Sequence, residues 1–385
     1  MRNDGSQLKQ QTVRCSQSSE SRPDRTETQF YPASSAKQLG RTAFHADTGT
    51  LWCYHAGTGI AFTAYGERCR ITLLADTSHC CLVCAAHYAV YVNGRLFVES
   101  LLRVRQKVLD LSIAPEGTQI RIVKLSESAL SGLGIGLIRV GASSRTIRVQ
   151  QGRLLIPTPH EKLLIEFIGD SITCGYGVNG ICGTGSFSTW TEHAEKAFAI
   201  LTAKQLHADY SLVCFSGYGV CSGYTADGSY HPSEIVPPLY DKMGFSIAKL
   251  ENGRSIQNEH WNFRRQPDLI VINLGTNDAA YTGNDPEKQA QFADAYRAFL
   301  KTVRRNNPDA HLLCMLGTMG QTLCTAVSEA VRAYTAETGD SDIRFLAAAE
   351  QQEADGFGID WHPSAATHEK AAAVLSDYIR TWLEI

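Results

Sequence analysis

The chain has 385 residues, which is too long for one ordinary domain and suits two, since domains typically hold ~100–200 residues. Hydrophobic residues make up 43% and charged residues 19%, so the chain can bury a core and is not disordered as a whole. Lys and Arg number 36 against 39 Asp and Glu, a net charge of −3. A charge this close to balance exerts no long-range attraction on phosphate backbones, so nucleic acid is not an expected partner.

Residues 1–28 are rich in Gln, Ser and Arg and show no hydrophobic period, which predicts a mobile tail. They lack the apolar central run of a secretory signal peptide. No apolar stretch of about 18 residues occurs elsewhere, so we expect no membrane-spanning segment. We therefore expect a cytoplasmic protein whose 12 cysteines stay reduced, because their spacing shows no disulfide framework.

Residues 29–155 show short runs of alternating apolar and polar residues, which is typical of half-buried antiparallel strands. Asn93-Gly94 predicts a hairpin turn, because both residues tolerate positive φ. Many short strands without a clear helix favour an all-β sandwich of jelly-roll type. The clearest predicted strands are residues 59–65, 70–74, 88–92 and 119–123.

Residues 156–385 alternate apolar strands with helical patterns, which predicts a parallel sheet flanked by helices. Ligands on such sheets bind outside the carboxyl ends of the strands. The predicted strands are residues 162–168, 210–215, 268–274 and 311–316. The predicted helices are residues 187–207, 286–306, 322–338 and 363–383.

Polar residues with catalytic chemistry follow the predicted strands. Ser171 stands where the first strand turns into a helix, and Gly219 and Asn277 follow the next two strands. His362 lies just before the last helix. These are the parts of acyl transfer: Ser171 attacks a carbonyl, and His362 takes its proton and later gives it to the leaving alcohol. The backbone N–H groups of Ser171 and Gly219 and the Asn277 amide are the expected oxyanion donors.

The same motifs resemble the sequence blocks of SGNH (GDSL-type) hydrolases, and more closely those of carbohydrate esterase family 2. Residues 168–177, which contain Gly169-Asp170-Ser171 and Tyr176, resemble the nucleophile block. Gly275-x-Asn277-Asp278 resembles the third block and Asp360-Trp361-His362-Pro363 the histidine block. The resemblance covers nearly the whole chain after the tail. It implies a three-layer, flavodoxin-like catalytic domain behind a jelly roll. It also implies removal of acetyl groups from plant oligo- or polysaccharides such as xylan and mannan, without a metal or cofactor.

Three residues are expected at the substrate, namely Trp361, Tyr218 and Asp170. The resemblance makes Trp361 a stacking platform for a sugar ring, although core packing is the alternative. Tyr218 opens a long insertion, residues 217–266, that is rich in aromatic residues. Long loops of this kind are usually functional, and aromatic faces stack on sugars.

Two positions depart from the SGNH pattern. Most of these hydrolases carry Asp three residues before the catalytic histidine, where this chain has Ile359. We expect Asp360 to orient His362, with a backbone carbonyl as the alternative acceptor in a Ser–His dyad. The second block has Ser216-Gly217-Tyr218-Gly219 in place of Asn-x-Gly, so Gly217 competes with Gly219 as the oxyanion donor.

Other candidates are weaker. His368 is a rival base, but it falls within the last helix, where a solvated face is expected. Cys80, Cys81 and Cys84, with His79 and His87, have the composition of a zinc site. They also fit a strand, which would point them to opposite faces, so ordinary thiols are the favoured interpretation.

We therefore expect a carbohydrate O-acetyl esterase. The alternatives are an acyl hydrolase of other specificity, such as a thioesterase or lysophospholipase, and a non-catalytic carbohydrate-binding protein on an esterase scaffold. The intact Ser171, Asn277 and His362 count against the binding protein.

Overall fold

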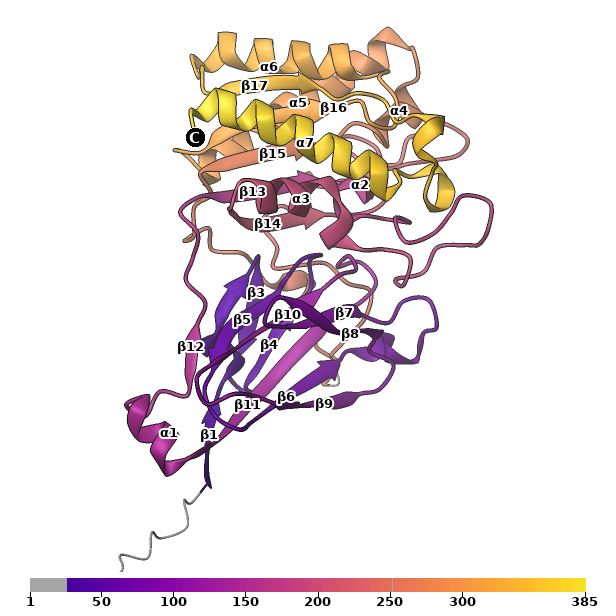
Figure 1. Cartoon of the computed structure of the whole chain (residues 1–385). Coiled ribbons are helices and arrows are strands. Elements are labelled where there is room, and N and C mark those ends of the chain that lie inside the picture. Colours follow the sequence, from indigo (N-terminus) through magenta and orange to yellow (C-terminus); the bar gives the residue numbers. More distant parts are fainter. Residues whose placement is uncertain (1–25, 251) are drawn as a thin grey trace, which may run out of the picture.

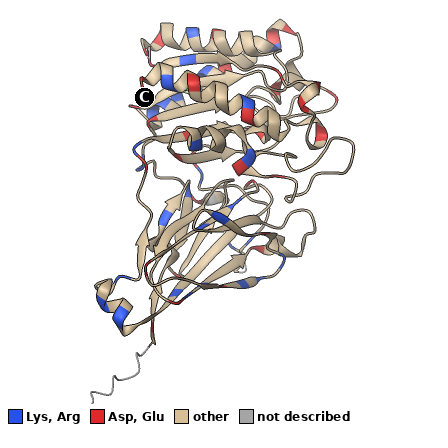
Figure 2. Cartoon of the chain, in the orientation of Figure 1, with Lys and Arg blue, Asp and Glu red and all other residues tan. Residues whose placement is uncertain are grey.

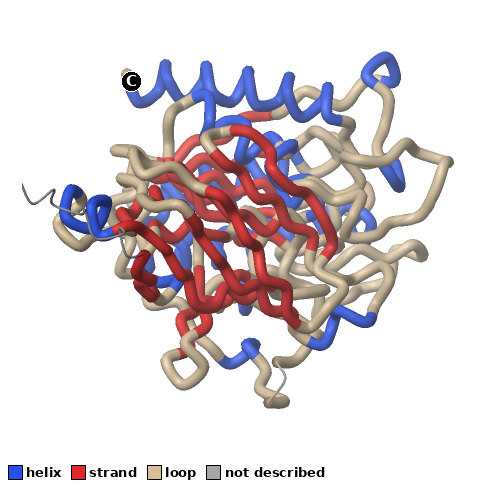
Figure 3. The backbone as a smooth tube through the Cα atoms, turned by 60° about the horizontal axis from the view of Figure 1, so that its bottom comes forward, coloured by secondary structure: helices blue, strands red, loops and turns tan. Residues whose placement is uncertain are grey.

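The structure, a computed structural model, describes residues 26–250 and 252–385. Two domains lie end to end in Figure 1, an antiparallel β-sandwich below and an α/β domain above. Figure 3 shows the strands gathered at the centre of the molecule, with helices around them. In the view of Figure 2, acidic and basic residues alternate over the helices of the α/β domain. Within the described ranges, no helix combines the length and apolar character needed to cross a membrane.

The sandwich consists of two antiparallel sheets whose inward side chains form one core. One sheet has the order β3-β4-β11-β6-β9 with β1 paired to β11; the other has the order β12-β5-β10-β7-β8 with β2 paired to β5. Alternate residues of β6, such as Cys69, Ile71 and Leu73, are fully buried, because successive side chains point to opposite faces. The strands are β1 Thr26–Tyr31, β2 Lys37–Leu39, β3 Thr42–His45, β4 Thr50–Cys53, β5 Gly59–Ala64, β6 Arg68–Ala75, β7 His87–Val92, β8 Arg95–Leu101, β9 Gln106–Ser112, β10 Thr118–Lys124, β11 Leu133–Ser143 and β12 Leu155–Pro157.

The second domain has a five-stranded parallel sheet in the order β14-β13-β15-β16-β17, the flavodoxin-like order expected from the resemblance. Helices α3 and α7 pack together over one face, and α5 and α6 over the other, which gives three layers. The strands are β13 Leu164–Gly169, β14 Asp209–Cys214, β15 Leu269–Asn273, β16 His311–Leu316 and β17 Ile343–Ala347. The helices are α2 Ser171–Cys174, α3 Phe198–Gln205, α4 Asp278–Thr282, α5 Pro286–Asn306, α6 Cys324–Thr338 and α7 Ala365–Leu383.

The predicted strands are confirmed, as is the Asn93-Gly94 hairpin between β7 and β8. The long helix predicted over residues 187–207 is wrong, because only Phe198–Gln205 forms an α-helix. Thr189 instead uses its backbone N–H and its hydroxyl to bond the carbonyls of Val83 and Ala85 in the sandwich, so tertiary contacts replace helical ones. The short helix α1, Ser144–Val149, and strand β17 were not predicted.

Two predicted domain boundaries lie a few residues away from the ends of the strands that they should enclose. Residues 26–28, assigned to the tail, belong to β1, which pairs with β11. The rest of the predicted tail, residues 1–25, lies outside the described residues. Strand β12 ends at Pro157 and pairs with β5, so the sandwich extends slightly past residue 155.

Buried ion pairs join the two domains. Arg41 of the sandwich is fully buried and forms two hydrogen bonds with Glu166 on β13, at 2.9 and 3.2 Å. Arg121 on β10 pairs with Glu195 at 2.6 Å. Because a buried carboxylate is stable only when it is paired and hydrogen-bonded, each of these contacts depends on both domains.

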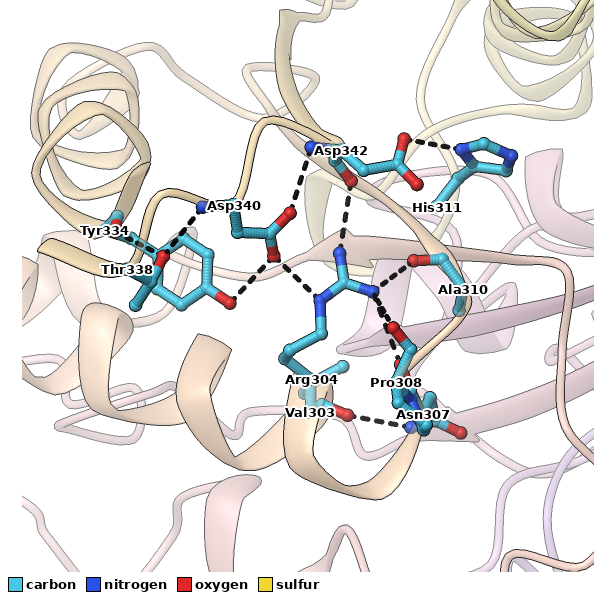
Figure 4. Close-up of polar contacts among 10 residues, drawn as sticks. All are labelled: Val303, Arg304, Asn307, Pro308, Ala310, His311, Tyr334, Thr338, Asp340 and Asp342. Carbon is cyan, nitrogen blue, oxygen red and sulfur yellow. Dashed lines mark hydrogen bonds and ion pairs between the residues drawn. The ribbon is translucent and has the colours of Figure 1, made fainter. Parts of the chain in front are cut away.

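The amino ends of the parallel strands hold a structural cluster around Arg304, shown in Figure 4. The guanidinium of this α5 residue bonds Asp340 at 2.8 Å and the carbonyls of Pro308 and Asp342 at 3.1 and 3.3 Å. Tyr334 of α6 donates to the same Asp340 carboxylate at 2.9 Å. The cluster ties α5 and α6 to the segments that lead into β16 and β17, at the edge of the sheet opposite the predicted site.

Candidate active site

Ser171 follows β13 directly and begins α2. The preceding Asp170 accepts a hydrogen bond from the Ile172 N–H at 3.0 Å, the usual contact of a helix N-cap. The Ser171 hydroxyl lies 2.8 Å from His362 Nε2. The structure therefore brings together the predicted nucleophile and base from segments that are 191 residues apart in the chain.

The other ring nitrogen of His362 faces backbone carbonyls. Nδ1 lies 3.1 Å from the Ile359 oxygen and 3.2 Å from the Asp360 oxygen. Because a carbonyl can only accept, Nδ1 carries the proton and Nε2 is left as the acceptor that a general base needs. The geometry is that of a Ser–His pair oriented by the main chain.

The Asp360 carboxylate forms no hydrogen bond with the His362 ring, so the prediction that this carboxylate orients the imidazole is wrong. Instead it accepts a hydrogen bond from the Tyr176 hydroxyl at 2.7 Å. Asp360 and Trp361 both have positive φ, of 51° and 62°. This turn is what aims the carbonyls of residues 359 and 360 at Nδ1, and it leaves the Asp360 side chain pointing elsewhere.

Tyr176 was missed as a site residue, although it belongs to the nucleophile block. Its ring lies against His362, with ring centroids 4.2 Å apart, and stacks on Phe187 at 4.0 Å. Tyr176 thus supports the imidazole and holds the Asp360 turn at the same time. The only sequence signal for this role is its position five residues after Ser171.

The candidate oxyanion donors are Ser171, Gly217 and Asn277. Within the described part of the chain, the N–H groups of Ser171 and Gly217 make no hydrogen bond. Gly217 has φ +82°, and a side chain there would meet no atom within 4 Å, so this residue borders open space. Asn277 Nδ2 donates to the Tyr218 carbonyl at 2.8 Å and to Asp170 Oδ2 at 3.4 Å, which places its amide between this loop and the residue before Ser171.

Gly219 is not available as the oxyanion donor that we expected. Its N–H donates to the Glu234 carbonyl at 3.2 Å, and a side chain at this position would overlap the Asp278 carboxylate. That buried carboxylate accepts the N–H groups of Val220, Cys221 and Ser222 at 2.7 to 3.0 Å. Gly219 therefore allows Asp278 to fix the loop, while the Gly217 N–H has no partner among the described residues.

The three predicted substrate residues lie in different environments. The Trp361 side chain is 63% exposed beside His362, as a stacking platform requires. Tyr218 is half-buried and packs on Phe215. Asp170 is fully buried, and burial raises its pKa to about 7. The assignment of Asp170 to substrate contact is therefore corrected to a capping and loop-positioning role.

The aromatic residues of the insertion divide into two groups. Tyr224 and Tyr230 are exposed, at 58% and 47%. Tyr240, Trp261 and Phe263 instead surround the Arg41 guanidinium at 5.0 to 5.4 Å and seal the domain interface.

The cysteine cluster of the sandwich does not form a set of metal ligands. Cys81 and Cys84 are paired in a disulfide, so the expectation that all 12 cysteines stay reduced is wrong for this pair, and Cys80 is a free, exposed thiol. His87 is buried, with its ring nitrogens at the Glu192 carbonyl and the Glu99 carboxylate. In the described ranges, the group with ligand atoms close together is Glu127, Cys174 and Glu192, within 4.8 Å of one another.

The rival base His368 is buried rather than solvated. Its Nδ1 accepts the Phe198 N–H at 3.1 Å, and burial lowers its pKa to about 3. It is therefore a neutral core residue that joins α7 to α3.

The pH dependence of the reaction follows from His362. Burial lowers the pKa of His362, although the two carbonyls and the Asp360 charge act in the opposite direction. Only the neutral imidazole can accept the Ser171 proton, so kcat/KM should stay level through neutral pH. We expect it to fall only below the ordinary histidine value of ~6.5. A pH profile of kcat/KM measures this, and an acid limb centred above that value would contradict it.

Asp360→Asn is expected to keep kcat within about 3-fold of wild type, since an amide oxygen accepts from Tyr176 equally well and Asn tolerates positive φ. If the carboxylate instead oriented His362, the loss would be on the order of 10⁴-fold. Steady-state kinetics on an aryl acetate separates the two outcomes. Tyr176→Phe serves as the comparison variant, because it removes the donor of the hydrogen bond that Asp360→Asn retains.

Residues 167–370 match the GDSL-like lipase/acylhydrolase family, a range that includes both Ser171 and His362. The chain belongs to this family. It is 34% identical over 238 residues to the cellulase/esterase CelE of Acetivibrio thermocellus, covering 60% of this chain and 27% of that protein. It is 28% identical over 279 residues to an acetylxylan esterase / glucomannan deacetylase of Cellvibrio japonicus, covering 70% of this chain and 71% of that protein. The match thus spans about a quarter of CelE.

Solved structures share both domains. A family two carbohydrate esterase from Clostridium thermocellum, in complex with cellohexaose, is 26% identical. It covers 90% of this chain and 99% of that chain, with a TM-score of 0.75. The acetyl xylan esterase Est2A of Butyrivibrio proteoclasticus has the same fold, with a TM-score of 0.78 at 24% identity over 93% of this chain and 99% of that chain.

Proposed function

We propose that the protein is a serine esterase that removes O-acetyl groups from oligo- or polysaccharides of the xylan and mannan class. The observation that carries this proposal is the 2.8 Å contact between Ser171 Oγ and His362 Nε2, with Nδ1 held by carbonyls. The named activities of CelE and of the Cellvibrio japonicus esterase support it.

The proposed reaction has two halves. Ser171 Oγ attacks the acetyl carbonyl while His362 Nε2 takes its proton, and Asn277 and the N–H groups of Ser171 and Gly217 stabilise the oxyanion. The C–O bond to the sugar then breaks, and His362 gives the proton to the leaving sugar hydroxyl. Water next attacks the acetyl-serine with His362 as base, which releases acetate and restores the Ser171 hydroxyl.

Neutral sugars are the substrate class that the surface fits best. The exposed indole of Trp361 adjoins the base, and exposed aromatic rings bind sugar rings by stacking. The near-neutral charge of the chain also suits an uncharged ligand, which needs stacking and hydrogen bonds more than electrostatic steering.

Acyl-chain length tests the specificity. With 4-nitrophenyl esters from acetyl to octanoyl, we expect kcat/KM to be highest for acetyl. A preference for octanoyl would favour the lysophospholipase or thioesterase alternative. Sugar binding without turnover of any ester would favour the non-catalytic binding protein.

The cytoplasmic location stays a prediction. It favours imported oligosaccharides over intact polymers as substrates. Fractionation of expressing cells tests it, and recovery of the protein outside the cell would contradict it.

A further inference from the structure

The turn between β10 and β11 of the sandwich reaches into the hydrolase domain and ends beside the predicted oxyanion loop. Its central residue, Glu127, is only 3% exposed. The Glu127 carboxylate accepts a hydrogen bond from the backbone N–H of Ser216 at 2.8 Å. Ser216 is the residue before Gly217, so the sandwich contacts the loop one peptide away from an oxyanion donor.

This contact completes a clamp on the loop. On one side, Glu127 fixes the N–H of Ser216. On the other side, the Asn277 amide fixes the carbonyl of Tyr218 at 2.8 Å. The Gly217 peptide lies between these two anchors, and its φ of +82° is a conformation that glycine adopts without strain but that free loops leave readily.

The backbone around Glu127 is fixed by hydrogen bonds. Its backbone N–H donates to Glu192 Oε2 at 3.0 Å, and its carbonyl accepts from the buried Lys124 ammonium at 2.7 Å. The next residue, Ser128, bonds both the N–H and the carbonyl of Phe245 in the long insertion, at 3.0 and 2.6 Å. An acceptor held this firmly can set the position of the peptide that it binds.

The charged side chains of Lys124, Glu127 and Glu192 are all buried. Burial raises the pKa of both Glu127 and Glu192 and lowers the pKa of Lys124 to about 8. The Lys124 ammonium donates to the backbone carbonyls of Ser126 and Glu127, at 2.5 and 2.7 Å. Burying such groups is costly unless their hydrogen bonds are satisfied. Here one carboxylate oxygen of Glu127 accepts its hydrogen bond from the Ser216 N–H of the oxyanion loop.

We propose that Glu127 is a positioning residue for the oxyanion loop, supplied to the hydrolase by the sandwich domain. This role rests on the proposed function, because it assigns Gly217 to the stabilisation of an oxyanion. The sandwich is then a working part of the active site, and its removal or local distortion impairs the chemical step itself.

The test compares three replacements of Glu127, with 4-nitrophenyl acetate as substrate and kcat expressed per titrated active site. Glu127→Ala removes the acceptor. Glu127→Asp keeps the charge but shortens the side chain by one methylene, so the carboxylate no longer reaches the Ser216 N–H. We expect both to lower kcat by about 10- to 100-fold with little change in KM, part of the effect of losing one oxyanion donor. Glu127→Gln keeps an oxygen that accepts the Ser216 N–H, so we expect it to recover most of the rate.

Glu195→Ala is the matched control for a general loss of interface stability. Glu195 is also a buried interface carboxylate, paired with Arg121, but makes no contact with the oxyanion loop. We expect this variant to lower the melting temperature while leaving kcat per active site unchanged. Wild-type kcat in both Glu127→Ala and Glu127→Asp, or an equal loss of kcat in Glu195→Ala, would overturn the proposal.

A second readout reports on the oxyanion directly. When an organophosphonate phosphonylates Ser171, the phosphoryl oxygen gains negative charge in the transition state and is stabilised by the same proposed oxyanion donors. Glu127→Asp should therefore slow phosphonylation in parallel with kcat. An unchanged phosphonylation rate would also overturn the proposal. The aryl ester and the phosphonate react with any working serine esterase. Wild-type protein that reacts with both but releases no acetate from sugars would therefore contradict the proposed substrate, while the effect of the Glu127 variants on the oxyanion loop could still be judged.

Discussion

Replacing Ser171 with alanine is expected to lower kcat on 4-nitrophenyl acetate by on the order of 10⁴- to 10⁶-fold. The reason is that the Ser171 hydroxyl, 2.8 Å from His362 Nε2, is the group that forms the acetyl intermediate. His362→Ala removes the base of the same pair and should cost about as much. The double variant should lose no more than either single one, because the two side chains act as one unit.

The measurement is steady-state kinetics on the three variants, with circular dichroism to show that each is folded. Electrospray mass spectra of the wild type, quenched during turnover, should show an added acetyl group that is missing from Ser171→Ala. Additive losses in the double variant, or an acetylated Ser171→Ala protein, would mean that another residue is the nucleophile.

The second large effect is expected at Asn277. Asn277→Ala should lower kcat by about 10²- to 10³-fold, the usual cost of removing one oxyanion donor. Its Nδ2 also holds the Tyr218 carbonyl, so the variant loses a donor and an anchor of the loop together. KM should change much less than kcat, since the donor acts on charge that develops only in the transition state.

Asn307→Ala is the control for Asn277. Asn307 is also a buried asparagine, and it donates to the Tyr240 hydroxyl at 2.7 Å and to the Val303 carbonyl at the end of α5. This variant should lower stability and leave kcat unchanged. An Asn277→Ala variant that resembles it in both respects would show that Asn277 has a structural role only.

Much of the fold follows from local sequence signals. Strand β6 has the alternating burial of a half-buried sheet, and α5 begins and ends at the predicted residues, Pro286 and Asn306. Ser171, Asn277 and His362 were found because the ends of parallel strands gather at one edge. That rule depends only on the order of elements along the chain.

Two of the errors come from contact between segments that are far apart in sequence, and one comes from local backbone geometry. Gly219 and Gly217 are indistinguishable by motif, and only the Glu234 carbonyl shows which N–H is already used. Asp360 has the right chemistry to orient His362, but the positive φ of Asp360 and Trp361 turns carbonyls toward the ring instead. Residues 187–197 form no α-helix, and Thr189 and Ala194 bond to the sandwich instead.

Glu127 illustrates the same limit at the domain level. Its sequence neighbourhood, Lys124 to Ser128, has no catalytic motif and lies in the predicted sandwich. Only the packing of the two domains places its carboxylate 2.8 Å from the Ser216 N–H. A domain boundary predicted from the hydrophobic pattern of the sequence therefore separates residues that the structure brings together in one site.

The central claim is that Ser171 removes acetyl groups from carbohydrate hydroxyls. Its most direct test is NMR of acetylated xylo- and manno-oligosaccharides incubated with the wild type and with Ser171→Ala. We expect the wild type to release acetate from at least one of them, with loss of the matching O-acetyl ring signals, and Ser171→Ala to leave the spectra unchanged. Absence of acetate from both substrates with folded wild type, or equal release by Ser171→Ala, would contradict the account.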